Sequence, residues 1–141
     1  MEFAIDNMRF IAYNVIEMCS FEEKKVKNFE IIFYDKPDGT EPALDFIMSL
    51  NDKMQARVLR TIKLLSENGT DLREPYSKHL VDGIFEVRAK VGSDISRVLY
   101  FFVFGRNIVL TNGFIKKTQK TPKHEIELAK KYRNEYLNRK R

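Results

Sequence analysis

Four basic residues, in or at the ends of three predicted strands, are the clearest candidates for catalytic residues in this sequence. Arg88 lies in an alternating segment, Arg97 interrupts an apolar run, and Lys116 and Lys117 follow the next run. If these strands are neighbours in one sheet, the four cations approach one region. Positive charge stabilises a phosphoryl group in its transition state, and crowding lowers a lysine's pKa toward neutrality, where it can exchange a proton. These residues are therefore candidates for catalysis on a phosphodiester.

Each cation also has a purely structural interpretation. Arg88 could belong to the solvent face of an edge strand, and Lys116 and Lys117 could protect a sheet end from aggregation. Arg97 differs, because an unpaired charge in an apolar run is costly and needs either a carboxylate partner or a functional cleft. Tyr100 follows in the run Leu-Tyr-Phe-Phe and is expected in the core.

The two histidines are candidates for proton transfer, because their unperturbed pKa lies near neutrality. His124 is close in sequence to the basic pair and could act as acid or base, or lie on the surface. His79 precedes the alternating strand, where a surface role is expected. Lys90, Lys120 and Lys123 are expected to contact phosphates, which positions a nucleic acid without reading its sequence.

Several common reaction types lack support in the sequence. It contains no Gly-rich phosphate loop, no Gly-x-Ser-x-Gly elbow and no paired histidines on a helix face. Its carboxylates are scattered, so we expect no metal site and no cofactor. Metal-free RNA cleavage uses the ribose 2′-hydroxyl as nucleophile and needs a proton acceptor, positive charge on the phosphorane and an acid.

Composition places the chain among globular proteins of one domain. It has 141 residues, of which 43% are hydrophobic and 12% aromatic. Residues 113–141 carry 10 basic and 3 acidic groups, a net charge of +7 against +5 for the whole chain. A concentrated basic end favours a polyanionic partner, nucleic acid before membrane, although a solvated helix face would look the same.

Cysteine content and the N-terminal stretch bear on localisation. The single cysteine, Cys19, cannot form an internal disulfide, which favours a reducing compartment. The apolar stretch over residues 10–16 is broken by Asn14 and preceded by Glu2 and Asp6, so it lacks a basic signal-peptide start and a membrane-spanning length. We expect a cytoplasmic protein with no membrane partner.

The elements that must position these residues follow from hydrophobic periodicity. Residues 29–34 predict a strand, and Thr40 is expected to cap a helix with Pro42 in its first turn. A second helix opens at Asn51 or Asp52 and ends at Asn68-Gly69, which makes an αα-hairpin. The meander that follows has strands beginning at Ile84, Ile95 and Ile108, and Thr121-Pro122 starts a last helix.

These elements predict an α+β fold. We expect an antiparallel sheet of about four strands, an αα-hairpin packed on it and a C-terminal helix, all within residues 29–141. Residues 1–28 are expected to be an N-terminal extension. Its apolar positions could line one face of a helix packed on the domain, or translation could begin at Met8 or Met18.

Three segments resemble the phage-derived HigB-like branch of the RelE/ParE toxin superfamily. They are Gly83-Ile-Phe-Glu-Val-Arg88, Ser96-Arg-Val-Leu-Tyr-Phe-Phe102 and Gly113-Phe-Ile-Lys-Lys-Thr-Gln-Lys-Thr-Pro122, with Glu125-Ile and Ala129 downstream. The resemblance covers residues from Phe29 to the end, and the last motif is the most specific.

The resemblance implies a ribosome-dependent mRNA endoribonuclease, the toxin of a type II toxin–antitoxin system. It also implies a cognate helix-turn-helix antitoxin and metal-free attack by the 2′-hydroxyl. The strand arginines of the superfamily match Arg88 and Arg97, and its basic pair matches Lys116 and Lys117. Its proton-transfer groups vary, so Tyr100, His124 and Tyr132 stay open as general acid or base. The superfamily also contains ParE-type toxins that act on DNA gyrase without cleaving nucleic acid, and a non-catalytic basic RNA-binding module is a further alternative.

Overall fold

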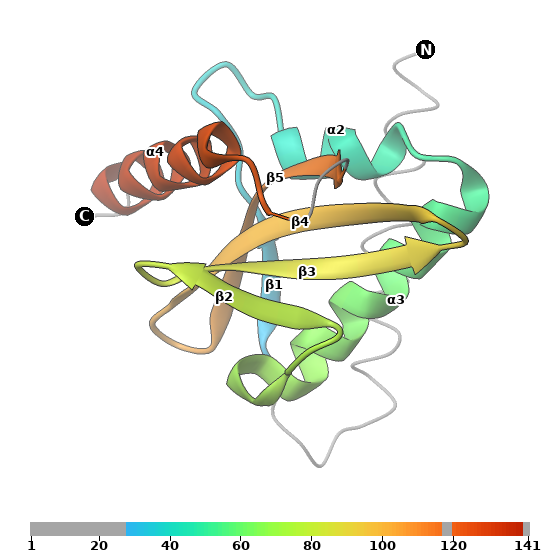
Figure 1. Ribbon diagram of the computed structural model, residues 1–141. Coiled ribbons are helices and arrows are strands. Elements are labelled where there is room, and N and C mark those ends of the chain that lie inside the picture. The colour runs from blue at the N-terminus through green and yellow to red at the C-terminus, as the bar shows by residue number, and fades with distance from the viewer. Residues whose placement is uncertain (1–27, 117–119, 140–141) are drawn as a thin grey trace.

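The computed structural model describes residues 28–116 and 120–139. The expected N-terminal helix and Lys117 lie outside these residues. The described chain forms one sheet of five strands flanked by helices (Figure 1). In chain order the elements are β1 (Glu30–Phe33), α2 (Pro42–Met48), α3 (Asp52–Asn68), a short 3-10 turn (Gly69–Asp71), β2 (Ser77–Val81), β3 (Ile84–Val91), β4 (Asp94–Val103), β5 (Asn107–Lys116) and α4 (Lys123–Arg139).

The α+β class is confirmed, but the sheet is mixed and larger than expected. Its order is β1-β5-β4-β3-β2, with β1 parallel to β5 and the other pairs antiparallel. The missed strand is β2, whose sequence Ser-Lys-His-Leu-Val is polar because it forms an edge. The prediction of a purely antiparallel sheet was wrong, because β1 pairs with β5, the last strand of the meander, and the two strands run parallel.

The two helices after β1 form as predicted, with differences at their ends. The side chain of Asn51 accepts a hydrogen bond of 2.9 Å from the Met54 N–H, and Gly69 ends α3 with a φ of +53°. Thr40 does not cap α2, because its N–H and hydroxyl both donate to Asp38 and Glu41 takes the cap position without a side-chain bond. The pair is a loose hairpin, since α2 packs mainly on β5 and α3 mainly on β3.

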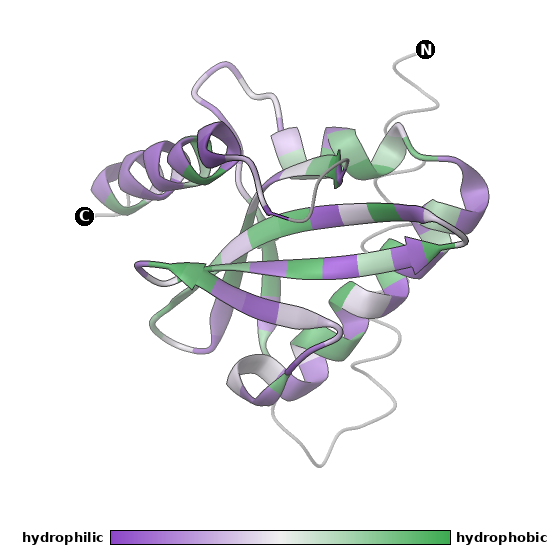
Figure 2. Cartoon of the chain, viewed as in Figure 1, coloured by the Kyte–Doolittle hydropathy of each residue, from purple (hydrophilic) through white to green (hydrophobic). Residues whose placement is uncertain are grey.

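The helices cover the two faces of the sheet unequally. α2 and α3 enclose the main core on one face, with Ile47, Ile62, Val87 and Leu110 among its fully buried side chains. α4 lies on the other face, over a smaller cluster that includes Leu99, Phe101 and Tyr136. Figure 2 shows hydrophilic and hydrophobic residues alternating along β3. The part of the second face that α4 leaves open therefore presents polar side chains.

Tyr100 lies in the main core, as expected. It is 1% exposed and stacks on Phe85, with ring centroids 5.4 Å apart. Burial raises the pKa of Tyr100 to about 12 despite a hydrogen bond with Ser77. None of the helices in the described chain has the length and apolarity needed to span a membrane.

Gly113 provides a test of the packing between β5 and α2. A Cβ at this position would clash with the ring of Phe46, so Gly113→Ala should lower the free energy of unfolding by about 1–3 kcal/mol. Urea unfolding of the variant measures the loss. Adding Phe46→Leu should restore part of it by making room, whereas purely additive losses in the double variant would contradict this account.

Candidate functional site

Strand register brings three of the expected cations together. Arg88 on β3 lies directly opposite Arg97 on β4. Lys116 on β5 lies opposite Ile95, which is the neighbour of Arg97 on the same face of β4. Side chains directly opposite each other in an antiparallel pair have Cβ atoms about 4.5–5.5 Å apart. The predicted convergence of Arg88, Arg97 and Lys116 is therefore present in the sheet.

A buried ion pair lies at the centre of this cluster. Glu86 is completely buried and Arg97 is 2% exposed. Nη1 of Arg97 lies 2.6 Å from Oε1 and 2.5 Å from Oε2 of Glu86. Of the two explanations offered for a charge in an apolar run, the carboxylate partner is thus present. Because both groups are buried, removing either one would leave the other as an unpaired charge in the core.

Thr121 completes the ion pair from outside the sheet. Its hydroxyl accepts a 2.9 Å hydrogen bond from Nη1 of Arg97 and donates one of the same length to Oε1 of Glu86. Thr121 precedes α4, where the N–H of Glu125 donates to the Pro122 carbonyl. The hydroxyl of Thr121 therefore ties the beginning of the last helix to the centre of the sheet, and Asn112 on β5 adds hydrogen bonds to Glu125.

Arg88 and Lys116 are held less tightly than Arg97. Nε of Arg88 lies 3.8 Å from Oε2 of Glu86, and the Arg88 side chain is 23% exposed. Partial burial lowers the pKa of Lys116, and repulsion from Arg97 and Arg88 adds to the effect while Glu86 opposes it. Crowding by like charges was predicted to lower a lysine pKa here, but loss of hydration is the larger cause.

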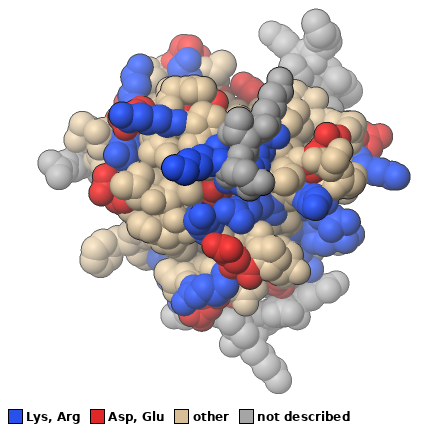
Figure 3. All heavy atoms as spheres, in the orientation of Figure 1, with Lys and Arg blue, Asp and Glu red and all other residues tan. Residues whose placement is uncertain are grey.

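Two cavities flank Arg97. The α3-side pocket, about 350 Å³, is lined by Arg57 and Thr61 from α3, by Pro75 and Tyr76 before β2, and by Arg88, Lys90, Arg97 and Lys116 from the sheet. The α4-side pocket, about 250 Å³, is lined by Lys78, His79, Glu86, Arg97, Lys120 and Thr121, among others. Figure 3 shows Lys and Arg side chains gathered over this part of the molecule. Such a surface suits a polyanion.

The sequence of this part of the chain matches a known protein family. Residues 45–134, which include the whole cluster of described cations, match the model of the family described as phage derived protein Gp49-like (DUF891). The chain belongs to this Gp49-like family. The family is associated with toxin–antitoxin systems and is related to the RelE-like toxins. No curated protein matches the chain.

Other expected site residues of this Gp49-like protein are distributed differently. Lys90 lines the α3-side pocket, and Lys120 and His79 line the α4-side pocket. His124 lies in the first turn of α4, its side chain 79% exposed and 3.3 Å from Glu125, and it lines neither pocket, nor does Lys123. Tyr132 is a buried residue of α4 itself and stacks on Tyr34, with ring centroids 4.7 Å apart. Of the three open candidates for proton transfer, none joins the cluster.

Sequence reasoning missed several residues of the site. Glu86 was given no role in the sequence analysis, yet it is fully buried beside Arg97. The signal that could have found it is that Arg97 required a carboxylate partner and that Glu86 lies in the strand predicted to pair with β4. Arg57 and Tyr76 come from segments that the strand pattern did not link to the sheet, so no periodicity pointed to them.

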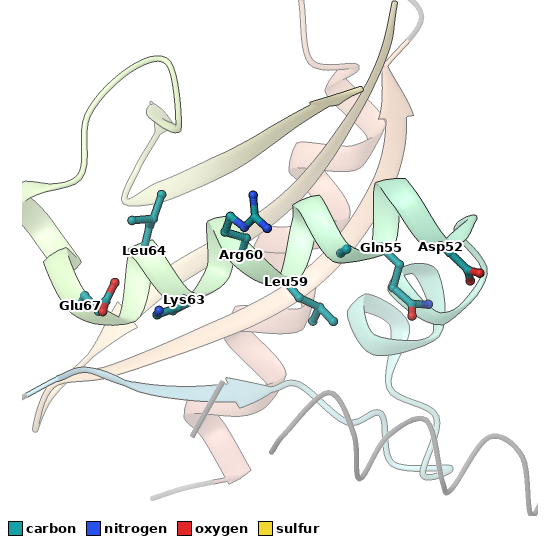
Figure 4. A pocket seen from close by; sticks show the side chains of 8 residues that line it. Asp52, Gln55, Leu59, Arg60, Lys63, Leu64 and Glu67 are labelled. Atoms are coloured by element: carbon teal, nitrogen blue, oxygen red, sulfur yellow. The ribbon is translucent and has the colours of Figure 1, made fainter. Parts of the chain in front are cut away.

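A larger groove lies away from this cluster, along the outer side of α3. It has a volume of about 630 Å³ and runs past Leu59 and Leu64, with Asp52 near one end and Glu67 near the other (Figure 4). Its charged residues are of both signs, so it lacks the concentration of cations that favours a polyanion. Across the described ranges, no three His, Cys, Asp or Glu residues gather as metal ligands would.

The buried pair predicts a double-variant result. Glu86→Leu should cost about 3–5 kcal/mol in unfolding free energy, because it leaves Arg97 charged and unpaired in the core. Combining it with Arg97→Met should recover most of that loss, since an apolar pair of similar size replaces the ions. Urea unfolding of the two single variants and the double variant measures the coupling; losses that simply add would show that the ion pair is not the source.

The lowered pKa of Lys116 predicts a pH dependence. Below its folded pKa, Lys116 is charged in the folded and unfolded states alike, so Lys116→Met should there be the more stable protein, because it removes a partly dehydrated charge and its repulsion from Arg97 and Arg88. Between the folded pKa and the ordinary value of about 10.4, the folded wild type binds fewer protons than the unfolded chain, so its stability should rise with pH relative to the variant. Urea unfolding of both proteins from about pH 7 to about pH 10 should show the gap narrowing; a gap that stays constant or widens would contradict the lowered pKa.

Proposed function

We propose that this Gp49-like protein is the toxin of a type II toxin–antitoxin system and acts as a metal-independent, ribosome-dependent mRNA endoribonuclease. The observation that supports this most directly is the convergence of Arg88, Arg97 and Lys116 on one face of the sheet. The resemblance of its motifs to the HigB-like branch supplies the reaction, the ribosome, the helix-turn-helix antitoxin and the cytoplasmic setting.

The proposed reaction is attack by a ribose 2′-oxygen on the adjacent phosphorus, with cleavage of the bond from phosphorus to the 5′-oxygen. The 2′-hydroxyl proton passes to a base, and an acid protonates the departing oxygen, leaving a 2′,3′-cyclic phosphate. Arg88 and Lys116 are placed to stabilise the phosphorane oxygens, because both line the α3-side pocket. Lys116 is also suited to proton exchange, since its pKa is lowered.

The other residues of the site have supporting roles in this proposal. Arg97 has a positioning role, because its Nη1 is engaged by Glu86 and Thr121 and so holds the carboxylate that also faces Arg88. Lys90 and Lys120, at the two pockets, contact phosphates of the same strand. His124 and Lys123, in the first turn of α4, stay in the proposal as a proton donor and a further basic contact, and Lys117 stays in it from its place in the sequence motif.

Arg88→Ala and Lys116→Ala should each lower the rate of mRNA cleavage by about 10²–10³, because each removes charge stabilisation from the transition state. Cleavage is measured in a translating extract with defined mRNA. Lys131→Ala is the matched control, since Lys131 is an exposed cation on α4, outside both pockets, and should leave the rate unchanged. Arg97→Ala is less informative, because loss of the buried pair should also destabilise the fold.

Three outcomes would point elsewhere. Cleavage that is equal in the wild type and both variants would remove the assigned site. Inhibition of DNA supercoiling with intact mRNA would favour a gyrase-directed toxin of the ParE type. A protein that binds RNA but neither cleaves it nor arrests growth when expressed would be a non-catalytic RNA-binding module.

A further inference from the structure

Tyr76 is an exposed aromatic residue at the rim of the α3-side pocket. Its side chain is 46% exposed, whereas Tyr34 and Tyr100 are each 1% exposed. Its carbonyl accepts a 2.8 Å hydrogen bond from the Arg88 N–H. Tyr76 therefore continues the β2–β3 pairing by one residue and lies directly across from Arg88, so the ring is held beside the cationic cluster.

The pocket exists because β2 begins late. Ser77 pairs with Val87, but β3 continues to Val91, so the last residues of β3 extend beyond the start of β2. The space beside them lies between the segment carrying Tyr76 and helix α3. Arg57, an exposed residue of α3, lines it together with Thr61.

The pocket thus has the parts of a nucleotide subsite. Its volume of about 350 Å³ falls in the range of about 300–1,000 Å³ typical of small-ligand pockets. An aromatic ring next to cations is the usual arrangement for a single-stranded nucleic acid, because the ring stacks on a base while the cations hold the backbone. A duplex would not fit this arrangement, since its bases are already stacked on one another.

We propose that Tyr76 stacks on one unpaired base of the bound RNA, in a subsite whose other wall is Arg57. The phosphate next to that nucleotide lies on Arg88 and Lys116. This inference rests on the proposed function, because it takes the polyanion at the cluster to be RNA. It adds a base-stacking residue that sets the position of the RNA strand relative to Arg88 and Lys116. The bound RNA must be single-stranded where it contacts Tyr76.

The test uses a single-stranded RNA oligonucleotide with 2′-O-methyl riboses, which cannot be cleaved, and follows binding by fluorescence anisotropy at low salt. Tyr76→Ala should weaken binding about tenfold, since loss of one stacked base has an effect of this order. Tyr76→Phe and Tyr76→Trp should bind like the wild type, because both retain a flat ring. Thermal unfolding checks that each variant is folded.

An abasic nucleotide moved along the same oligonucleotide separates stacking from a general loss of affinity. At one position, removing the base should weaken wild-type binding about tenfold and leave Tyr76→Ala binding unchanged. Equal effects of each abasic site on the two proteins, or wild-type affinity in Tyr76→Ala, would overturn the subsite.

Arg88→Ala distinguishes failure of the subsite from failure of the proposed function. If Arg88→Ala weakens binding while neither Tyr76→Ala nor an abasic site does, the subsite is wrong and the RNA site stands. If the wild type does not bind the oligonucleotide, the subsite is contradicted, and cleavage in the translating extract decides the proposed function separately. If Arg88→Ala binds as well as the wild type, the phosphate contact on Arg88 is contradicted.

Discussion

The buried pair of Glu86 and Arg97 is the interaction on which the rest of this structure depends. Two charges with almost no exposed surface would be very costly in an apolar core if either lacked its partner. Their pairing lets a charged residue occupy the middle of β4, next to Leu99 and Phe101. The same pair receives the hydroxyl of Thr121, so the sheet and the start of α4 are held by one small network.

The pair also determines how much positive charge is left on this face of the sheet. One carboxylate serves the buried Arg97 at 2.5 Å and the half-buried Arg88 at 3.8 Å. Lys116 is repelled by both arginines. Glu86 cannot neutralise all three, so a positive excess is left where the sheet meets solvent. An anion bound there would supply the charge that the protein itself lacks, which is the physical basis for a polyanionic partner.

Much of the fold followed from the pattern of residues, while the centre of the site did not. Alternation along β3 and the continuous apolar run of β4 correctly gave adjacent strands and the facing pair Arg88 and Arg97. Alternation assigns a side chain to one face of a sheet but does not say how deeply it is buried, so the burial of Glu86 could not be predicted from it. Whether a face is covered depends on distant elements such as α4. Edge strand β2 was missed because half-exposed polar strands carry little hydrophobic signal.

The parallel pairing of β1 with β5 has a consequence for synthesis of the protein. Glu30 to Phe33 find their partners only at Asn107 to Leu110, so most of the domain must leave the exit tunnel before the sheet can close. Contacts this distant in sequence also slow folding, because a long loop must be ordered first. Lys116 and Thr121 emerge later still. A nascent chain therefore has no complete basic face until translation has passed Thr121.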